Sequence, residues 1–224
     1  MNVLVTGGSS GLGAAVVAAI AKSGGQPYVI DRQAPAEGVP WVECDLADTR
    51  AAEAATRRIL EQSGGLDGVV TAAGTDTPGK LADIAPEVWE RVVTVDLLAT
   101  AAVVRAALPA LRDSHGTVVT VASTLGLKAV SDATAYCAAK FGVVGFTRAL
   151  AAELAGEVGV TLLVPGGMRT RFFDGRDEQY KPGPDAVLND PANVAAAVVF
   201  ALSQPPGCAV RELVVCAETE TSYP

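Results

Sequence analysis

The stretch TGGSSGLG (6–13) decides the fold of this 224-residue chain, because it joins an apolar run, VLVT (3–6), to an alanine-rich segment (11–23). A glycine-rich turn in that context is typical of the first strand and first helix of an α/β sheet. Short, mostly β-branched runs recur along the chain and predict six more strands. They are YVI (28–30), WVEC (41–44), GVVT (68–71), TVVTV (117–121), VTLLV (160–164) and ELVVC (212–216).

Between these runs lie segments with helical spacing, rich in alanine, the best helix former. They are 11–23, 48–63, 86–112, 133–156 and 191–203, with Asp48 and Asp190 at two of the expected N-caps. The strand runs are almost continuously apolar, as expected for parallel strands buried on both faces. The sequence therefore predicts a doubly wound, parallel, seven-stranded sheet of the Rossmann type, in three layers, within one domain (1–224).

The three spaced glycines of the turn each have a distinct expected task. Gly7 permits a tight turn out of the strand, Gly11 lets the backbone approach a pyrophosphate, and Gly13 lets the helix pack closely on the sheet. Free N–H groups at the helix start favour phosphate charge, and Ser9 and Ser10 add hydroxyl donors. The alternative is an ordinary flexible turn; we expect a dinucleotide site.

Asp31 ends the second predicted strand, where a carboxylate can accept hydrogen bonds from the adenosine ribose. It would repel a 2′-phosphate, since like charges ~4 Å apart cost about 1 to 4 kcal/mol depending on screening. Arg32 follows directly and could instead hold that phosphate. No basic residue stands inside the glycine turn, so we expect NAD, with NADP the less favoured alternative.

Composition excludes several classes of protein. The formal charge is −8 and the pI about 4.7, which argues against a nucleic-acid binder. The longest clean apolar run is the nine residues Val194–Leu202, whereas a membrane span needs ~20. Four scattered cysteines and one histidine predict free thiols and no metal site. We expect a soluble, cytoplasmic protein.

Tyr136 and Lys140 stand four residues apart, on one face of a predicted helix. A phenol has a reference pKa of ~10, too high for a base near neutrality. An ammonium at ~4 Å would lower that pKa by roughly three at most, and an oxidised nicotinamide would add to the effect. Tyr136 could then exchange a proton with an alcohol or a carbonyl oxygen, and Ser123, after the fifth strand, could hold that oxygen.

These motifs, in this order, resemble the short-chain dehydrogenase/reductase family from residue 2 to about 216. The resemblance is carried by TGGSSGLG, CDL (44–46), AAG (72–74), Ser123, YCAAK (136–140) and PGGMRT (165–170). It implies an NAD(P)-dependent oxidoreductase in which Lys140 also binds the nicotinamide ribose. The residues that it further assigns to the cofactor are Leu12, Asp45, Leu46, Ala72, Ala73, Gly74, Pro165, Gly166, Met168 and Thr170.

Two positions depart from the family pattern. Ala72 replaces an amide, and Asp96 replaces an asparagine that holds a water in a proton relay through the lysine. An aspartate can still accept a hydrogen bond from a water or from Lys140, but its charge would weaken the pull of Lys140 on the phenolate. We expect Asp96 to be a fourth catalytic residue with an altered pH profile; the alternative is a carboxylate without a catalytic role.

The expected activity is hydride transfer between nicotinamide and an alcohol or ketone of small size. The alternative is a catalytically weak dinucleotide-sensing or scaffolding protein. The aperiodic stretch 166–190 is expected to be a substrate lid. Broad apolar faces on the 86–112 helix and on the helix from about 136 to 154, together with the resemblance, imply a homodimer or homotetramer; the alternative is that loops bury these helices. No role is predicted for the tail after residue 216.

Overall fold

The computed structural model describes residues 1–223 and contains one seven-stranded sheet. All neighbouring strands are parallel, in the order β3-β2-β1-β4-β5-β6-β7. The strands are β1 (Asn2–Thr6), β2 (Gln26–Asp31), β3 (Trp41–Glu43), β4 (Gly68–Thr71), β5 (Thr117–Val121), β6 (Gly159–Pro165) and β7 (Glu212–Val215). The predicted strands are all confirmed, with ends that differ by at most two residues.

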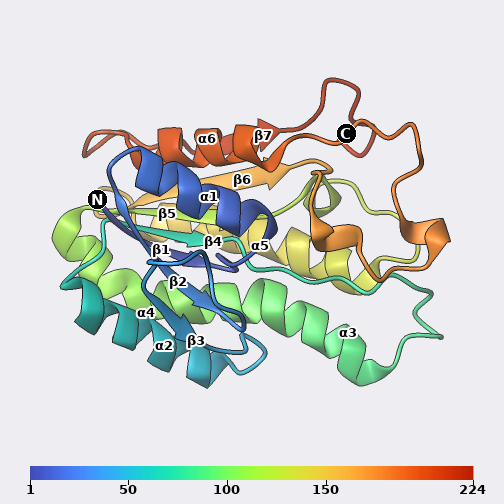
Figure 1. Ribbon diagram of the computed structural model, residues 1–224, viewed down its shortest axis with the longest axis horizontal. Coiled ribbons are helices and arrows are strands. Elements are labelled where there is room, and N and C mark those ends of the chain that lie inside the picture. The colour runs from blue at the N-terminus through green and yellow to red at the C-terminus, as the bar shows by residue number, and fades with distance from the viewer. Residues whose placement is uncertain (224) are drawn as a thin grey trace.

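Helices cover both faces of the sheet, which confirms the three-layer prediction (Figure 1). On one face α1 (Gly11–Lys22) and α6 (Pro191–Leu202) share an apolar cluster with the strands. On the other face lie α2 (Thr49–Ser63), α4 (Ala99–Ser114) and α5 (Thr134–Glu153), around a second cluster. Asp48 and Asp190 cap α2 and α6 as expected, because each carboxylate accepts backbone N–H bonds from the first turn.

One predicted helix is interrupted. The segment expected to be a single helix over 86–112 comprises α3 (Pro86–Val93), a π-helical turn η1 (Thr94–Leu98) and α4. Within the turn the N–H of Ala99 donates to the carbonyl of Thr94, five residues earlier. Such a turn inserts one extra residue into the helix, and π turns are frequent at functional sites. Here the turn contains Asp96.

The continuous helical segment Pro86–Ser114 is 29 residues long and apolar enough to cross a membrane by length and composition. Its position in the fold gives a simpler reason for that composition. Val103, Ala107 and Leu111 are fully buried in the cluster shared with the sheet, whereas Arg105 faces outward and pairs with Glu53. We interpret the segment as a core helix.

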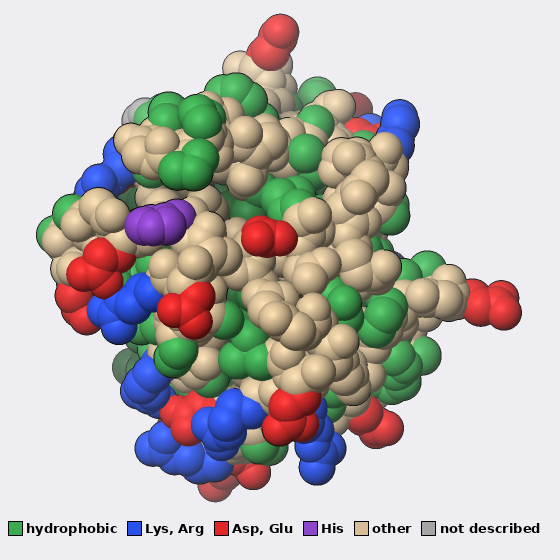
Figure 2. All heavy atoms as spheres, turned by 90° about the vertical axis from the view of Figure 1, so that its left-hand side faces the viewer, with side chains coloured by type: hydrophobic (Ala, Val, Ile, Leu, Met, Phe, Trp, Pro, Cys, Tyr) green, Lys and Arg blue, Asp and Glu red, His purple; other side chains and the backbone are tan. Residues whose placement is uncertain are grey.

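The sheet places a cleft at the carboxyl ends of its strands. β1 pairs with β2 on one side and β4 on the other, so the connections leave in opposite directions and open a crevice there. Figure 2 views the opposite, amino-terminal edge, where acidic and basic side chains are intermixed along the lower part of the face and hydrophobic and neutral groups cover much of the rest.

Candidate active site

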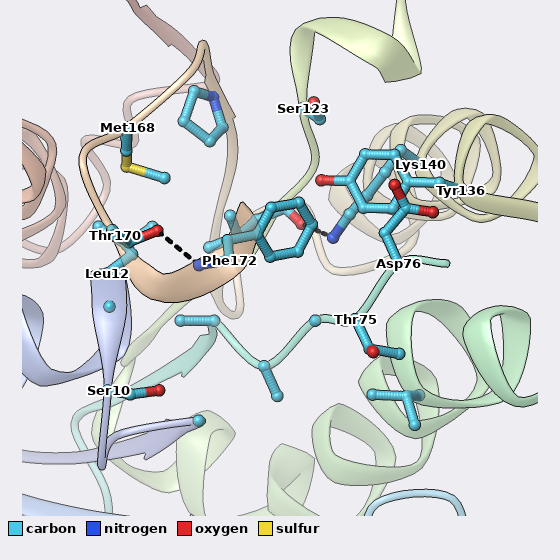
Figure 3. Close-up of a pocket in the computed structure, with 18 of the residues that line it drawn as sticks. Ser10, Leu12, Thr75, Asp76, Ser123, Tyr136, Lys140, Met168, Thr170 and Phe172 are labelled. Carbon is cyan, nitrogen blue, oxygen red and sulfur yellow. Dashed lines mark hydrogen bonds between the residues drawn. The ribbon is translucent and has the colours of Figure 1, made fainter. Parts of the chain in front are cut away.

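A cleft of about 580 Å³ opens at the carboxyl ends of β1, β2, β4, β5 and β6. The structure brings most of the predicted site residues into its walls (Figure 3). These are Gly7, Ser10, Gly11, Leu12, Asp31, Arg32, Asp45, Leu46, Ala72, Ala73, Gly74, Ser123, Tyr136, Lys140, Pro165, Gly166, Met168 and Thr170. Ser9, Gly13 and Asp96 lie behind the walls.

The glycine turn forms a cradle that larger residues would obstruct. Gly7 and Gly11 have positive φ angles of 71° and 53°. A Cβ at Gly7 would stand 2.7 Å from the Ala73 Cα, and one at Gly13 would overlap the Gly7 carbonyl oxygen. A Cβ at Gly11 would face Thr170 across the cleft at 3.6 Å. The bare backbone at the start of α1 therefore fits the pyrophosphate of a dinucleotide.

Ser9 does not face the cleft but ties the turn to the end of β2. Its hydroxyl lies 2.5 Å, and its N–H 3.0 Å, from Oδ2 of Asp31. The other carboxylate oxygen accepts the N–H of Gln33 at 3.1 Å. Asp31 is thereby held at the mouth of the cleft, beside Arg32. Further along, Asp45 is paired with Arg91, whose Nη2 lies 3.0 Å from both carboxylate oxygens.

Tyr136 and Lys140 lie on the first turns of α5, and both side chains are buried. The ammonium of Lys140 is 5.4 Å from the centre of the Tyr136 ring and donates to the carbonyl of Val121 at 3.1 Å. Ser123 follows β5, and its hydroxyl accepts the N–H of Leu125 at 3.1 Å. Figure 3 shows the Tyr136 and Lys140 side chains close together, with the Phe172 ring beside them and Ser123 above them in the view.

Asp96 joins three elements behind the cleft. Its Oδ1 accepts the N–H of Thr75 at 2.8 Å, and its Oδ2 lies 3.2 Å from the ammonium of Lys140. Its side chain has no solvent exposure, and that of Lys140 is 4% exposed. The neighbouring Gly74 leaves room for the pair, since a Cβ there would stand 3.3 Å from Oδ2. The carboxylate thus fixes Lys140 against the β4 loop.

The protein groups around Tyr136 do not by themselves lower the pKa of its phenol. Burial raises the pKa of the phenol, and the charges of Asp96 and Asp76 raise it further. Lys140 lowers that pKa, as the sequence suggested, and so does the Ser123 hydroxyl, but together they do not outweigh burial and the two carboxylates. Burial lowers the pKa of Lys140, yet Asp96 and Tyr136 raise it by more, so the ammonium stays charged. A phenolate near neutrality therefore needs a further positive charge in the cleft.

The stretch 166–190 is more ordered than its composition suggests. It contains two short 3₁₀ turns, η3 (Arg171–Phe173) and η4 (Glu178–Tyr180), and Met168 bridges to Asn189. Phe172 packs against Tyr136 with ring centres 5.7 Å apart. Arg176 of this stretch forms an ion pair with Asp76, which follows β4. Sequence reasoning assigned no role to Asp76, because it belongs to none of the recognised motifs.

The tail also contributes to the cleft, which no sequence pattern indicated. Glu220 accepts the N–H of Gly167 at 2.9 Å, and the Ser222 hydroxyl lies 2.6 Å from that of Thr124. Both tail residues line the cleft. They connect the loop after β6 to the loop after β5. The tail is thus part of the cleft wall and contacts Thr124, the residue after Ser123.

The cysteine, histidine and carboxylate side chains are the candidate metal ligands in the sequence. Within residues 1–223 no group of histidine, cysteine and carboxylate side chains is arranged to hold a metal ion. The four cysteines, Cys44, Cys137, Cys208 and Cys216, are free thiols.

Comparison with known proteins agrees with this geometry. The family model for short chain dehydrogenases matches residues 1–181. An L-fucose dehydrogenase of Mus musculus is 31% identical over 242 residues, covering 99% of this chain and 89% of that protein. The structure of a 3-ketoacyl-(acyl-carrier-protein) reductase from Brucella melitensis, complexed with NADH, has a TM-score of 0.85 at 25% identity and covers 97% of both chains.

The fold recurs at lower identity as well. An alcohol dehydrogenase from the archaeon Thermococcus sibiricus, complexed with 5-hydroxy-NADP, has a TM-score of 0.85 at 22% identity, covering 96% of this chain and 95% of that one. That likeness supports the fold alone. With the family match and the Mus musculus relative, the parallel sheet and the cleft lead to one conclusion: the chain belongs to the short-chain dehydrogenase/reductase family and is an NAD(P)-dependent oxidoreductase.

Proposed function

We propose that this protein interconverts an alcohol and a ketone with NAD, using Tyr136 as the acid/base. The observation that carries the proposal is the convergence of phenol, ammonium and serine hydroxyl at one end of a cleft whose other end is a glycine cradle. The nicotinamide, when bound, accepts or supplies the hydride and adds positive charge in its oxidised form. That charge is the one that the Tyr136 phenol needs.

The roles of the side chains follow from their positions. Tyr136 takes the proton of an alcohol or returns one to a carbonyl oxygen. Ser123 steadies the same oxygen with its hydroxyl. Lys140 holds positive charge beside the phenol and presents an ammonium to the nicotinamide ribose. Asp96 is a positioning residue, because it contacts Lys140 and the Thr75 amide but does not line the cleft.

The residues proposed to bind the cofactor are those predicted residues that line the cleft, with Ser9 and Gly13 behind it. The turn backbone and Ser10 hold the pyrophosphate, and Leu12 lies beside them. Asp31 accepts the ribose hydroxyls, while Asp45 and Leu46 flank the adenine. Ala72, Ala73 and Gly74 form the floor, and Pro165, Gly166, Met168 and Thr170 meet the nicotinamide end. Ser9 and Gly13 act through the shape of the turn, Ser9 by binding Asp31 and Gly13 by permitting close packing.

Replacing Asp31 by alanine is expected to shift the preference from NADH toward NADPH. The carboxylate opposes a 2′-phosphate, and a repulsion of about 1 to 4 kcal/mol corresponds to a roughly fivefold to thousandfold change in relative affinity. Arg32 stands beside it to receive the phosphate once the carboxylate is gone. The measurement is the ratio of the two dissociation constants by cofactor fluorescence, with exposed Asp83→Ala as the matched control. Tighter NADPH than NADH binding in the unaltered protein would contradict the role of Asp31.

Replacing Asp96 by asparagine is expected to move the rising limb of the pH–rate profile for alcohol oxidation to lower pH. The negative charge of Asp96 raises the pKa of Tyr136 by disfavouring the phenolate. Asparagine removes that charge but keeps an oxygen for the Thr75 amide. The profile of kcat/KM against pH measures the shift, since it reports the pKa of the essential group in the free enzyme. Identical limbs in both proteins would make Asp96 a bystander.

The proposed function is tested by titrating the protein with NADH and NADPH and then assaying a panel of alcohols and ketones. We expect binding of NADH and turnover of at least one secondary alcohol, with Tyr136→Phe inactive. Binding without turnover, equal in both proteins, would instead favour a dinucleotide-sensing or scaffolding protein. The substitution of Asp96 for the usual asparagine is the feature that favours this second function.

We also propose that the protein self-associates and is located in the cytoplasm. Leu98 in η1 and Phe141 in α5 are large apolar side chains left exposed on the two long helical segments. Pairing these segments across a two-fold axis would cover both residues in a homodimer or homotetramer. Free thiols at all four cysteines suit a reducing compartment.

A further inference from the structure

The cleft contains an ion pair that has no part in the proposed acid/base chemistry, formed by Asp76 and Arg176. Nη2 of Arg176 is 3.0 Å from Oδ2 of Asp76, and the two side chains are 11% and 5% exposed. The guanidinium stacks over the rings of Phe172 and Phe173, 4.7 Å and 4.9 Å from their centres. All four residues line the cleft. The two aromatic rings thus cover the ion pair and shield it from solvent.

Part of the hydrogen-bonding capacity of the pair is not used by the protein. Among residues 1–223, the buried atoms Oδ1 of Asp76 and Nε and Nη2 of Arg176 have no hydrogen-bond partner. The contact between Nη2 and Oδ2 is an ion pair without the geometry of a directed hydrogen bond. Buried polar atoms in native proteins nearly always have a partner in the protein or in an ordered water, so an acceptor and donors left together indicate a place for a small hydrogen-bonding group, which a substrate can supply in place of water.

These atoms lie beside the reacting phenol. The Phe172 ring contacts both the guanidinium of Arg176 and the ring of Tyr136. The charge of Asp76 is close enough to raise the pKa of the Tyr136 phenol. Figure 3 shows Asp76, Tyr136 and Lys140 around the same end of the cleft. A small substrate that reaches Tyr136 with one oxygen can therefore reach the pair with another.

The chemistry of the pair selects one kind of group. A hydroxyl can donate to Oδ1 of Asp76 and accept from the guanidinium of Arg176 at once. A carboxylate or phosphate accepts only, and it would meet the negative charges of Asp76 and Asp96. An ammonium donates only, and it would meet the positive charges of Arg176 and Lys140. A hydroxyl is the group that satisfies both partners without bringing a new charge into a buried site.

We infer that Asp76 and Arg176 form a hydroxyl-binding subsite that selects alcohols and ketones carrying a second hydroxyl group, as in diols and polyols. This inference rests on the proposed function, since it requires that the reacting oxygen meets Tyr136. The subsite adds a specificity-determining pair to the site. It favours hydroxylated substrates over plain hydrocarbon chains with a single oxygen.

The test compares matched substrates that differ by one hydroxyl, with saturating NAD: butan-2-ol against butane-2,3-diol, and cyclohexanol against cis-cyclohexane-1,2-diol. Hydrogen bonds to charged groups correspond to roughly a tenfold to hundredfold effect, so we expect kcat/KM for the diols to exceed that for the mono-alcohols by about tenfold or more. In Asp76→Ala, which removes the acceptor, and Arg176→Met, which removes the donors, the diol advantage is expected to fall toward one. Asp83→Ala removes an exposed carboxylate on the same connection; it serves as the matched control and keeps the advantage.

The wild-type comparison needs no variant, so the inference stays testable if a substitution impairs folding. NADH binding by fluorescence shows that each variant retains the cofactor cradle. Turnover of mono-alcohols and diols with equal kcat/KM would overturn the subsite while leaving the proposed function intact. An undiminished diol advantage in a folded Asp76→Ala protein would also overturn it. NADH binding without turnover of any substrate would overturn the proposed function, and the subsite with it.

Discussion

Tyr136→Phe is expected to lower kcat by about 10²–10⁴-fold, the usual contribution of a positioned general acid or base. The phenylalanine ring keeps the packing against Phe172, so the shape of the cleft should persist. Only the hydroxyl that exchanges a proton with the substrate is lost. Steady-state rates of alcohol oxidation measure the effect, and NADH fluorescence should show nearly unchanged cofactor binding.

The matched control is Tyr28→Phe, the same substitution in β2. Tyr28 is buried in the core cluster and does not line the cleft, so its loss of a hydroxyl should leave kcat near that of the wild type. A Tyr136→Phe protein that keeps most of its activity would show that the proton moves through another group. Equal losses in both variants would indicate a general effect on folding rather than catalysis.

Lys140→Met is expected to lower the free energy of unfolding by about 3–5 kcal/mol, because it leaves Asp96 buried without its partner. For a protein of this size that corresponds to a fall in Tm of roughly 6–20 °C. Burial already raises the pKa of Asp96 above its ordinary 3.8. The loss should therefore be small at pH values below 3.8, where the carboxyl is protonated in both states, and should grow as the pH rises. Thermal unfolding followed across pH measures both effects.

The double variant Lys140→Met/Asp96→Asn isolates the buried charge. It removes both charges and keeps an oxygen for the Thr75 amide, so it should regain much of the lost stability while remaining inactive. Lys22→Met at the exposed end of α1 is the control for loss of a lysine and should change stability by no more than about 0.5 kcal/mol. Equal destabilisation in the single and double variants would argue against the ion pair.

The sheet could be predicted from the sequence because its information is local. Each strand is a short apolar run, each helix is an alanine-rich segment, and two helices begin at the aspartates that cap them. The glycine turn then determines where the first strand and helix meet. The π turn could not be foreseen, because the composition of Thr94–Leu98 carries no local signal for an extra residue within the helix.

The same distinction between local and long-range information holds for the candidate site. Residues inside contiguous motifs, such as Tyr136 and Lys140, could be placed by their helical spacing alone. Asp76, Arg176 and Glu220 could not, because each acquires its partner from a segment far away in the chain. Ser9 shows a further limit of motif reading. Its hydroxyl was expected to face the phosphate, but in the structure it binds Asp31.

The π turn also sets the rotational phase of the helix that follows it. Each residue of an α-helix advances the chain by about 100° around the axis. Deleting one residue from Thr94–Leu98 would restore regular winding but rotate α4 relative to α3 by about that angle. The stripe of Val103, Ala107 and Leu111 would then turn away from the sheet, and outward-facing Arg105 would turn toward it. A single-residue deletion in this turn would therefore misalign an entire helix.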